Sequence, residues 1–267
     1  MSGVPRARGG HIAGVQGGFD CDRDASVRFQ TLSYKLNWVT ISICSEHIKS
    51  KPTHAQTISL LEAAGDLSCD PVIRQAKARL CELWDSRRLP SQLQHGDDRS
   101  WELMITTIRL AREHNLPSIL KRIFYEVVSN EEYWTTYHKD RDSIYLTSMD
   151  RERLLCAREG LGRLWRDFVV IPPEASQKAD GIDRPSTHRQ GCCYRGREWG
   201  QTWMLFMVEK NELDRGALDP LRYNIIDHRL DNLVNEWWCV PCLRNKEKAW
   251  EEKKLDWWML LDDLLWL

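Results

Sequence analysis

The sequence predicts a mainly α-helical fold, in which stacked helical hairpins precede a helical subdomain that carries several cysteines. Apolar residues recur at spacings of three and four from residue 58 to the end of the 267-residue chain, as on one face of a helix. Prolines and small polar residues interrupt these runs where helices are expected to begin and end. Hydrophobic residues make up 42% and charged residues 29% of the chain, so a buried core is expected.

Charge and composition argue against several kinds of partner. The chain carries 38 basic and 39 acidic residues, whereas a dedicated nucleic-acid-binding protein normally has a basic excess. No apolar run approaches the roughly 18 residues of a membrane span, and the first residues contain no apolar signal-peptide core. We therefore expect neither nucleic acid nor membrane as a partner. The nine cysteines, an odd number, are expected to be reduced thiols in a cytoplasmic or nuclear protein.

Changes in composition divide the chain into four expected segments. The first is rich in glycine and has no periodic apolar face, which is typical of a flexible leader. The third is polar and contains proline and glycine, as linkers and long loops do. The segments are a flexible leader at 1–30, a helical-hairpin region at 31–172, a linker or long loop at 173–190, and a Cys- and Trp-rich helical subdomain at 191–267.

Two similar units form the first part of the hairpin region, at about residues 57–84 and 101–129. Each consists of a helix, a short turn that ends in proline and a second helix, and the interval between the units is about 47 residues. In the first unit we expect Asp70 to cap the second helix and Pro71 to occupy its first position. The hairpins are expected to stack, because each has to bury an apolar face against its neighbour.

The clearest single helix is predicted at about residues 149–169. Its apolar residues step by three and four along one face, and Arg158 interrupts that face, so this arginine is expected at the edge. Thr147 or Ser148 can cap the start of the helix. Burial of the leucine, tryptophan and phenylalanine side chains explains the pattern without any further function.

Two more helices are expected in the subdomain at 191–267. One runs over about residues 219–237, and the other is a charged, tryptophan-rich helix that ends the chain. The last helix has one apolar face, which is expected to pack on the domain and consists of Trp257, Trp258, Leu261 and Leu265. The run at 244–254 mixes both signs of charge, so we expect a solvated face and not a nucleic-acid-binding patch.

Four cysteines form the one constellation with the spacing of a metal site. Cys239 and Cys242 are separated by two residues, as are two thiolate ligands in a zinc knuckle. Cys192 and Cys193 could complete a structural zinc site, and His188 could replace one of the thiolates. Adjacent ligands and the long separation of the two pairs depart from common zinc patterns, so buried or incidental thiols are the alternative interpretation.

The sequence contains no motif of a known catalytic site. It has no phosphate-binding glycine loop, no H-E-x-x-H and no G-x-S-x-G. The acidic run at 20–24 resembles the start of a calcium loop, but the sixth position is not glycine and the twelfth is not glutamate. We therefore expect no catalytic residue, no enzymatic activity and no cofactor other than a structural zinc ion.

Several segments follow one another in an order that is characteristic of one family. ITTIRLAREHNLPSILKRIFYEVV and LTSMDRERLLCAREGLGRLWRDFV are followed by PP, CC, DPL, WCVPC and a closing Trp- and Leu-rich helix. Over about residues 40–267 the chain resembles the C-terminal half of fungal (basidiomycete) BTB/POZ-domain proteins. In that family an N-terminal BTB fold precedes the helical region and mediates dimerisation or adaptor contacts. Residues 1–40 show no BTB strand–helix pattern, so functions of the BTB fold are not carried over.

The sequence therefore favours a non-enzymatic protein–protein interaction module, or a remnant BTB-type adaptor, that binds an unknown protein partner or a second copy of itself. The alternative is a zinc-stabilised transcription or nucleic-acid-associated regulator, which the cysteines alone support. An apolar face is expected near residues 32–43, where it either forms the interface or folds back onto the first hairpin. Its residues are Leu36, Trp38, Ile41 and Ile43.

Overall fold

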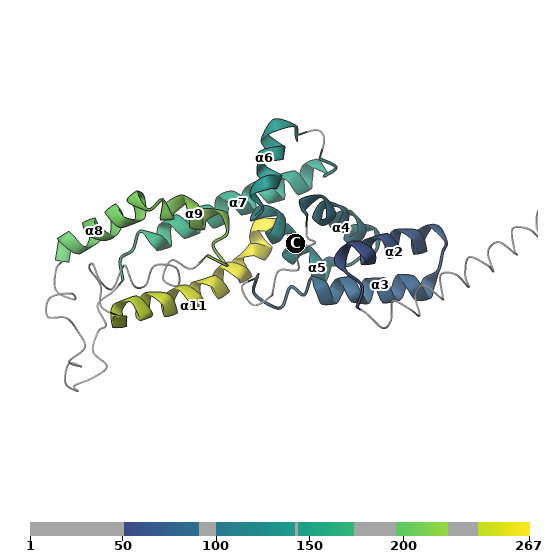
Figure 1. Cartoon of the computed structure of the whole chain (residues 1–267), viewed down its shortest axis with the longest axis horizontal. Helices are drawn as coiled ribbons and strands as arrows, with labels where there is room; N and C mark the ends of the chain where they lie inside the picture. Colours follow the sequence, from purple (N-terminus) through teal and green to yellow (C-terminus); the bar gives the residue numbers. More distant parts are fainter. Residues whose placement is uncertain (1–50, 91–99, 142–143, 174–195, 224–239) are drawn as a thin grey trace, which may run out of the picture. The chain divides into compact units, whose positions relative to one another are not determined.

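The computed structural model describes residues 51–90, 100–141, 144–173, 196–223 and 240–267. Helices make up 78% of these residues, and no strand occurs among them, which confirms the mainly α-helical fold (Figure 1). The chain divides into two units, Met1–Lys51 and Pro52–Leu267. All described residues except Lys51 belong to the second unit, and the fold below is that of this unit.

The described helices span both of the regions in which helices are expected. In chain order they are α2 (His54–Asp66), α3 (Asp70–Leu83), α4 (Trp101–Glu113), α5 (Pro117–Val128), α6 (Glu131–Lys139), α7 (Ser148–Val169), α8 (Gly196–Glu209), α9 (Glu212–Leu218) and α11 (Val240–Leu265). The first four form the two predicted hairpins, and α7 matches the predicted single helix.

The turns of the two hairpins are built in the same way. Ser68 links α2 to α3 and Asn115 links α4 to α5, and both have left-handed backbone, with φ of 51° and 54°. In each turn the next residue donates its backbone N–H to a carbonyl in the last turn of the preceding helix. Cys69 donates to Ala64 over 2.9 Å, and Leu116 donates to Ala111 over 2.7 Å. Such bonds satisfy carbonyls that a helix end leaves unpaired. The repeat seen in the sequence is therefore a structural repeat.

Helix α2 contacts α4, and α3 contacts α5, which confirms the predicted stack. A buried histidine joins the hairpins, because His54 Nε2 lies 2.9 Å from Thr107 Oγ1. The Thr107 hydroxyl donates to the Leu103 carbonyl at 2.6 Å, so the histidine nitrogen is the donor in the first bond. The His54 ring also meets the buried Trp84 edge-on, with 5.0 Å between ring centroids.

The N-cap residues of three helices follow one another at the interval of 47 residues that also separates the two hairpins. Thr53, Ser100 and Thr147 each accept a hydrogen bond from a backbone N–H in the first turn of α2, α4 and α7. This confirms Thr147 as the cap of α7. The prediction for Asp70 is wrong: Cys69 occupies the cap position of α3, and Asp70 is already the first helical residue, followed by Pro71.

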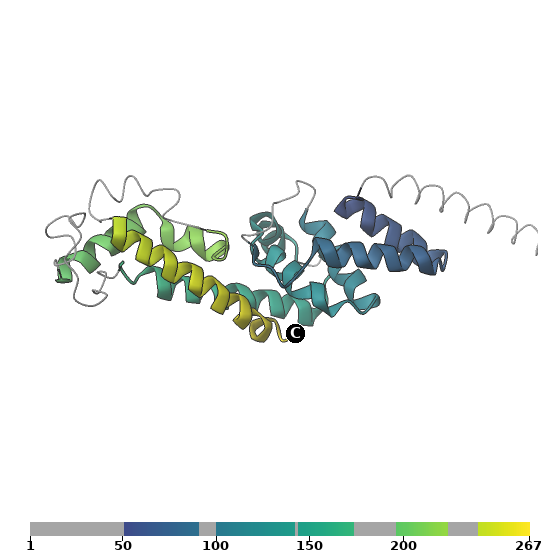
Figure 2. The same ribbon diagram turned by 90° about the horizontal axis from the view of Figure 1, so that it is seen from below.

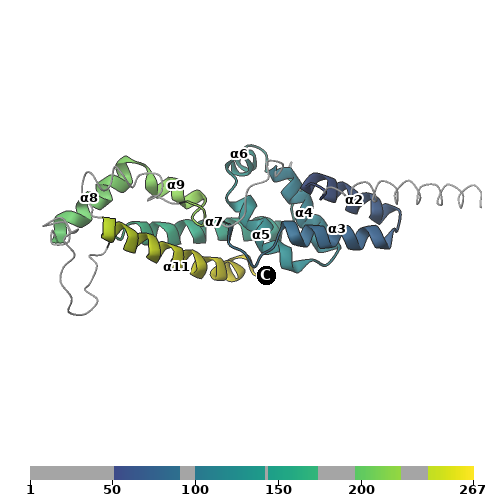
Figure 3. The same cartoon turned by 60° about the horizontal axis from the view of Figure 1, so that its bottom comes forward.

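Helix α5 lies at the centre of the described part of the unit, because it contacts α3, α4, α7 and α11. Every residue from Ile119 to Val128 is buried. Helix α7 in turn contacts α9 and α11, and the latter two also lie beside α7 in the turned views (Figure 2, Figure 3). The helices of the predicted C-terminal subdomain therefore pack directly on the hairpin region.

Two predictions for the C-terminal part need correction. The helix expected over 219–237 does not begin at Asp219, because 219–223 form a turn whose side chains are held by other parts of the fold; residues 224–237 lie outside the described part. The charged run at 244–254 is not wholly solvated. Lys246 and Lys254 are 7% and 3% exposed and lie over the rings of Phe168 and Trp250.

Candidate interaction surface

The structure describes only one of the predicted zinc ligands. Cys242 lies in the first turn of α11, and its side chain is fully buried. Cys192, Cys193, Cys239 and the alternative ligand His188 lie outside the described residues. The predicted apolar face at 32–43 lies outside them as well. Within the described ranges, no group of three or more His, Cys, Asp or Glu side chains is arranged to hold a metal ion.

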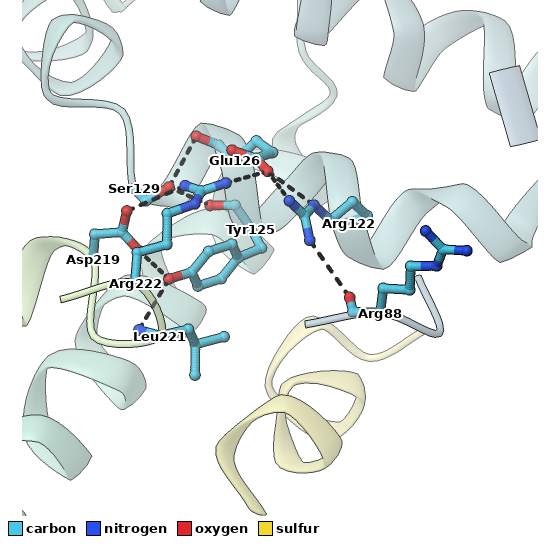
Figure 4. A network of polar contacts seen from close by, with 8 residues as sticks. All are labelled: Arg88, Arg122, Tyr125, Glu126, Ser129, Asp219, Leu221 and Arg222. Carbon is cyan, nitrogen blue, oxygen red and sulfur yellow. Dashed lines mark hydrogen bonds and ion pairs between the residues drawn. The ribbon is translucent and has the colours of Figure 1, made fainter. Parts of the chain in front are cut away.

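A buried network of charged side chains joins α5 to the turn after α9 (Figure 4). At its centre is Glu126, which is 5% exposed and accepts hydrogen bonds from two arginines. Arg122, on the same helix, reaches it over 2.8 Å, and Arg222, in the turn, over 2.5 Å. Arg222 also binds Asp219 at 3.1 Å. Two guanidinium groups thus share one buried carboxylate.

Tyr125, the neighbour of Glu126 on α5, completes this network (Figure 4). Its hydroxyl donates to the Asp219 carboxylate and accepts a hydrogen bond from the Leu221 N–H at 3.2 Å. Burial, and the nearby charge of Asp219, raise the pKa of Tyr125 well above its usual value. Burial opposes the charge of Arg222, but the carboxylates of Asp219 and Glu126 outweigh it and raise the pKa of that guanidinium. The tyrosine therefore stays neutral and the arginine stays charged.

The network acts as a clamp on the fold. It binds the 219–223 turn to α5, and Arg122 extends it by donating to the Arg88 carbonyl at 3.4 Å. Its charged groups satisfy one another, which a buried charge requires. Sequence reasoning missed it, because Arg122 and Glu126 are four residues apart and resemble a pair on a solvated helix face. The clue is that apolar residues flank the pair on most sides of α5, where Lys121 is the other charged residue.

The inner face of α11 is apolar, as predicted, and packs on the domain. Its members, all at most 4% exposed, are Trp250, Trp257, Trp258, Leu261 and Leu265. Trp257 meets Phe168 of α7, and Trp258 meets Tyr125 of α5, both edge-on. An ion pair between Lys121 and Asp262, 2.7 Å long, fixes the same helix to α5. The helix is thereby held along its length.

The outer face of α11 also carries large apolar side chains. We use this name for Leu255, Met259 and Trp266, which are 55%, 67% and 50% exposed. Leu255 and Met259 are four residues apart, which places them on one side of the helix, away from the buried face, whereas Trp266 follows the last helical residue with left-handed backbone, at φ 50°. Trp266 directly follows α11, and its carbonyl accepts a hydrogen bond from Arg153 of α7. The outer face is therefore presented by a firmly anchored helix.

Comparison with known proteins adds no relative. The chain matches no protein-family model, no curated protein and no solved structure. A search of the described helices for a segment long and apolar enough to cross a membrane also finds none. The candidate surface therefore rests on the chemistry of this chain's own residues.

Proposed function

We propose that this chain is a non-enzymatic protein-interaction module and that it contacts its partner through the outer face of α11. The observation that carries this proposal is the two-sided apolar character of α11. A helix that packs on a core normally presents polar residues to water on its other side. Here Leu255 and Met259, each more than half exposed, stand among exposed charged residues such as Glu252 and Asp256, and the half-exposed Trp266 follows the helix end. A protein that covers these side chains would bury their apolar area, and this burial would stabilise the complex.

The residue types fit this role. Tryptophan is enriched among the residues that dominate binding energy at protein interfaces. Methionine is flexible and adapts to differently shaped partner surfaces. The buried charged side chains around Glu126 form hydrogen bonds and ion pairs with one another, so they stabilise the fold and do not point to a binding site. The sequence resemblance to the helical region of BTB/POZ proteins supports an interaction module, apart from the contacts that the BTB fold itself makes in that family.

Replacement of Met259 by aspartate tests the proposal. Because Met259 is 67% exposed, this change should alter the free energy of unfolding by no more than about 0.5 kcal/mol. We expect it to remove the proteins that co-purify with the wild-type chain from cells, or to abolish self-association in sedimentation velocity. The matched control is Met149→Asp, at a methionine of α7 that is 55% exposed and does not belong to the outer face. Equal behaviour of the two variants would contradict the proposed surface.

A further inference from the structure

Exposed charges near the two ends of α11 are arranged against the dipole of the helix. The first turn holds no acidic residue, and the last turn holds no basic one. Arg244 and Lys248 are exposed near the start, whereas Asp263 is exposed in the last turn. The start of a helix favours negative charge and its end favours positive charge. This distribution does not stabilise α11 itself, so it calls for another explanation.

The same charges share one side of the helix with the outer face. Counted from Arg244, the next members are Lys248, Leu255, Met259 and Asp263, at intervals of four, seven, four and four residues, and all five are exposed. Such intervals keep residues on one side of a helix. The two apolar residues therefore lie between a basic end, formed by Arg244 and Lys248, and an acidic end, formed by Asp263.

The charges of the basic end and of the acidic end form no ion pair with any residue that the structure describes. Their neighbours on α11 differ in this respect. Asp262 binds Lys121 of α5 at 2.7 Å, and Lys253 binds Asp256 at 2.9 Å. The acidic end and the basic end are thus the charges of this side that remain for a partner.

A second copy of α11 complements this pattern when the two helices run antiparallel. Lys248 of each copy then lies opposite Asp263 of the other, and the two-fold axis passes between Leu255 and Asp256. Met259 packs on the methylene stem of the opposite lysine and beside the opposite Leu255, so apolar contacts lie between the two ion pairs. In a parallel pair each charge would instead face its own copy, which repels.

We propose that the outer face of α11 binds the same face of a second copy of this chain in antiparallel orientation. This inference rests on the proposed function, because it names the partner of that surface. Contact from Arg244 to Asp263 would cover about 30 Å of helix on each copy. Since only two apolar residues of each helix contribute to it, we expect a weak dimer, with a Kd on the order of 10 µM.

Exchange of the charges at Lys248 and Asp263 tests this orientation in the full chain, by sedimentation velocity over about 2–200 µM. Lys248→Glu or Asp263→Lys alone turns both ion pairs of the dimer into repulsive pairs, so each should weaken the dimer about tenfold. The double variant restores both pairs and should dimerise within about twofold of the wild type. An equimolar mixture of the two single variants should also dimerise, because each pair of the mixed dimer unites opposite charges.

The variants are not expected to disturb the fold, because both positions are exposed. At a concentration where the chain is monomeric, neither single variant should shift the melting temperature by more than about 2 °C. The matched control is Lys210→Glu, at an exposed lysine that directly follows α8 and lies away from α11 in the sequence. It should leave the dimer unchanged.

A wild-type chain that stays monomeric over the whole concentration range would overturn the inference. So would a dimer that the single variants leave intact, as parallel pairing or another surface predicts, or one that the double variant or the mixture fails to restore. The proposed function fails separately. If the wild type is monomeric and Met259→Asp still loses a co-purifying protein, the outer face binds a different protein, and only the self-pairing is wrong.

Discussion

Replacement of Glu126 by glutamine should destabilise the fold strongly, because it removes the charge at the centre of a buried network. The side chain keeps its size, but Arg122 and Arg222 lose the negative charge that they share. Arg122 is fully buried and Glu126 is 5% exposed, so water cannot replace the lost interaction. Removal of one partner from a buried ion pair costs about 3–5 kcal/mol. Because glutamine retains one acceptor oxygen, we expect the lower end, about 3 kcal/mol.

Urea unfolding, followed by tryptophan fluorescence, measures this loss. With a urea dependence of about 2–3 kcal/mol per molar for a unit of this size, the midpoint should fall by roughly 1 M. Trypsin should also cleave faster after Arg222, because the clamp no longer holds the 219–223 turn. The matched control is Glu62→Gln, which breaks the exposed pair with Arg109, and should cost less than about 1 kcal/mol. Equal midpoints for the two variants would refute the clamp.

Three further predictions concern packing, pH and metal. Gly216→Ala should destabilise the fold by about 1–3 kcal/mol or more in urea unfolding, because the added Cβ would lie 2.0 Å from the Trp165 ring. The control Gly65→Ala, which has open space around the added Cβ, should instead stabilise the fold by about 0.4–1 kcal/mol. Burial, together with the charge of Lys77, lowers the pKa of His114 below its ordinary value of 6.5, so the unfolded chain binds this proton more readily. Stability should therefore fall as the pH drops below 6.5, and His114→Gln should flatten that dependence in melts at several pH values. If the four predicted cysteines bind zinc, elemental analysis should find one ion per chain and a chelator should lower the melting temperature; no zinc and no shift would refute that site.

The hairpins could be predicted from the sequence because their information is local. A helix, a turn with proline and a second helix recur at one interval, and apolar spacing marks the buried faces. The inner face of α11 was predictable for the same reason. Helix α6 was missed, since it has nine residues, and its aromatic side chains pack on distant partners such as Trp101. Short helices depend on tertiary packing more than on propensity.

The polar features were hardest to predict because they depend on distant parts of the chain. Asp219 looked like the start of a helix, but its carboxylate is bound by Tyr125, far away in sequence. Lys246 and Lys254 looked solvated, yet their ammonium groups lie over aromatic rings, which only the folded geometry reveals. The Tyr133 hydroxyl, which has no partner among the described residues, leaves no signal in the sequence, because such a lack is a property of the folded chain.

The central claim, that the outer face of α11 binds another protein, is tested most directly by site-specific photo-crosslinking in cells. A photoreactive amino acid in place of Met259, whose side chain is 67% exposed, would report what lies against that face. The same group in place of Met149 supplies the background. We predict a discrete crosslinked protein, or a crosslinked dimer of the chain, at position 259 that is absent at position 149. Identical products at both positions, or none at 259, would contradict the claim.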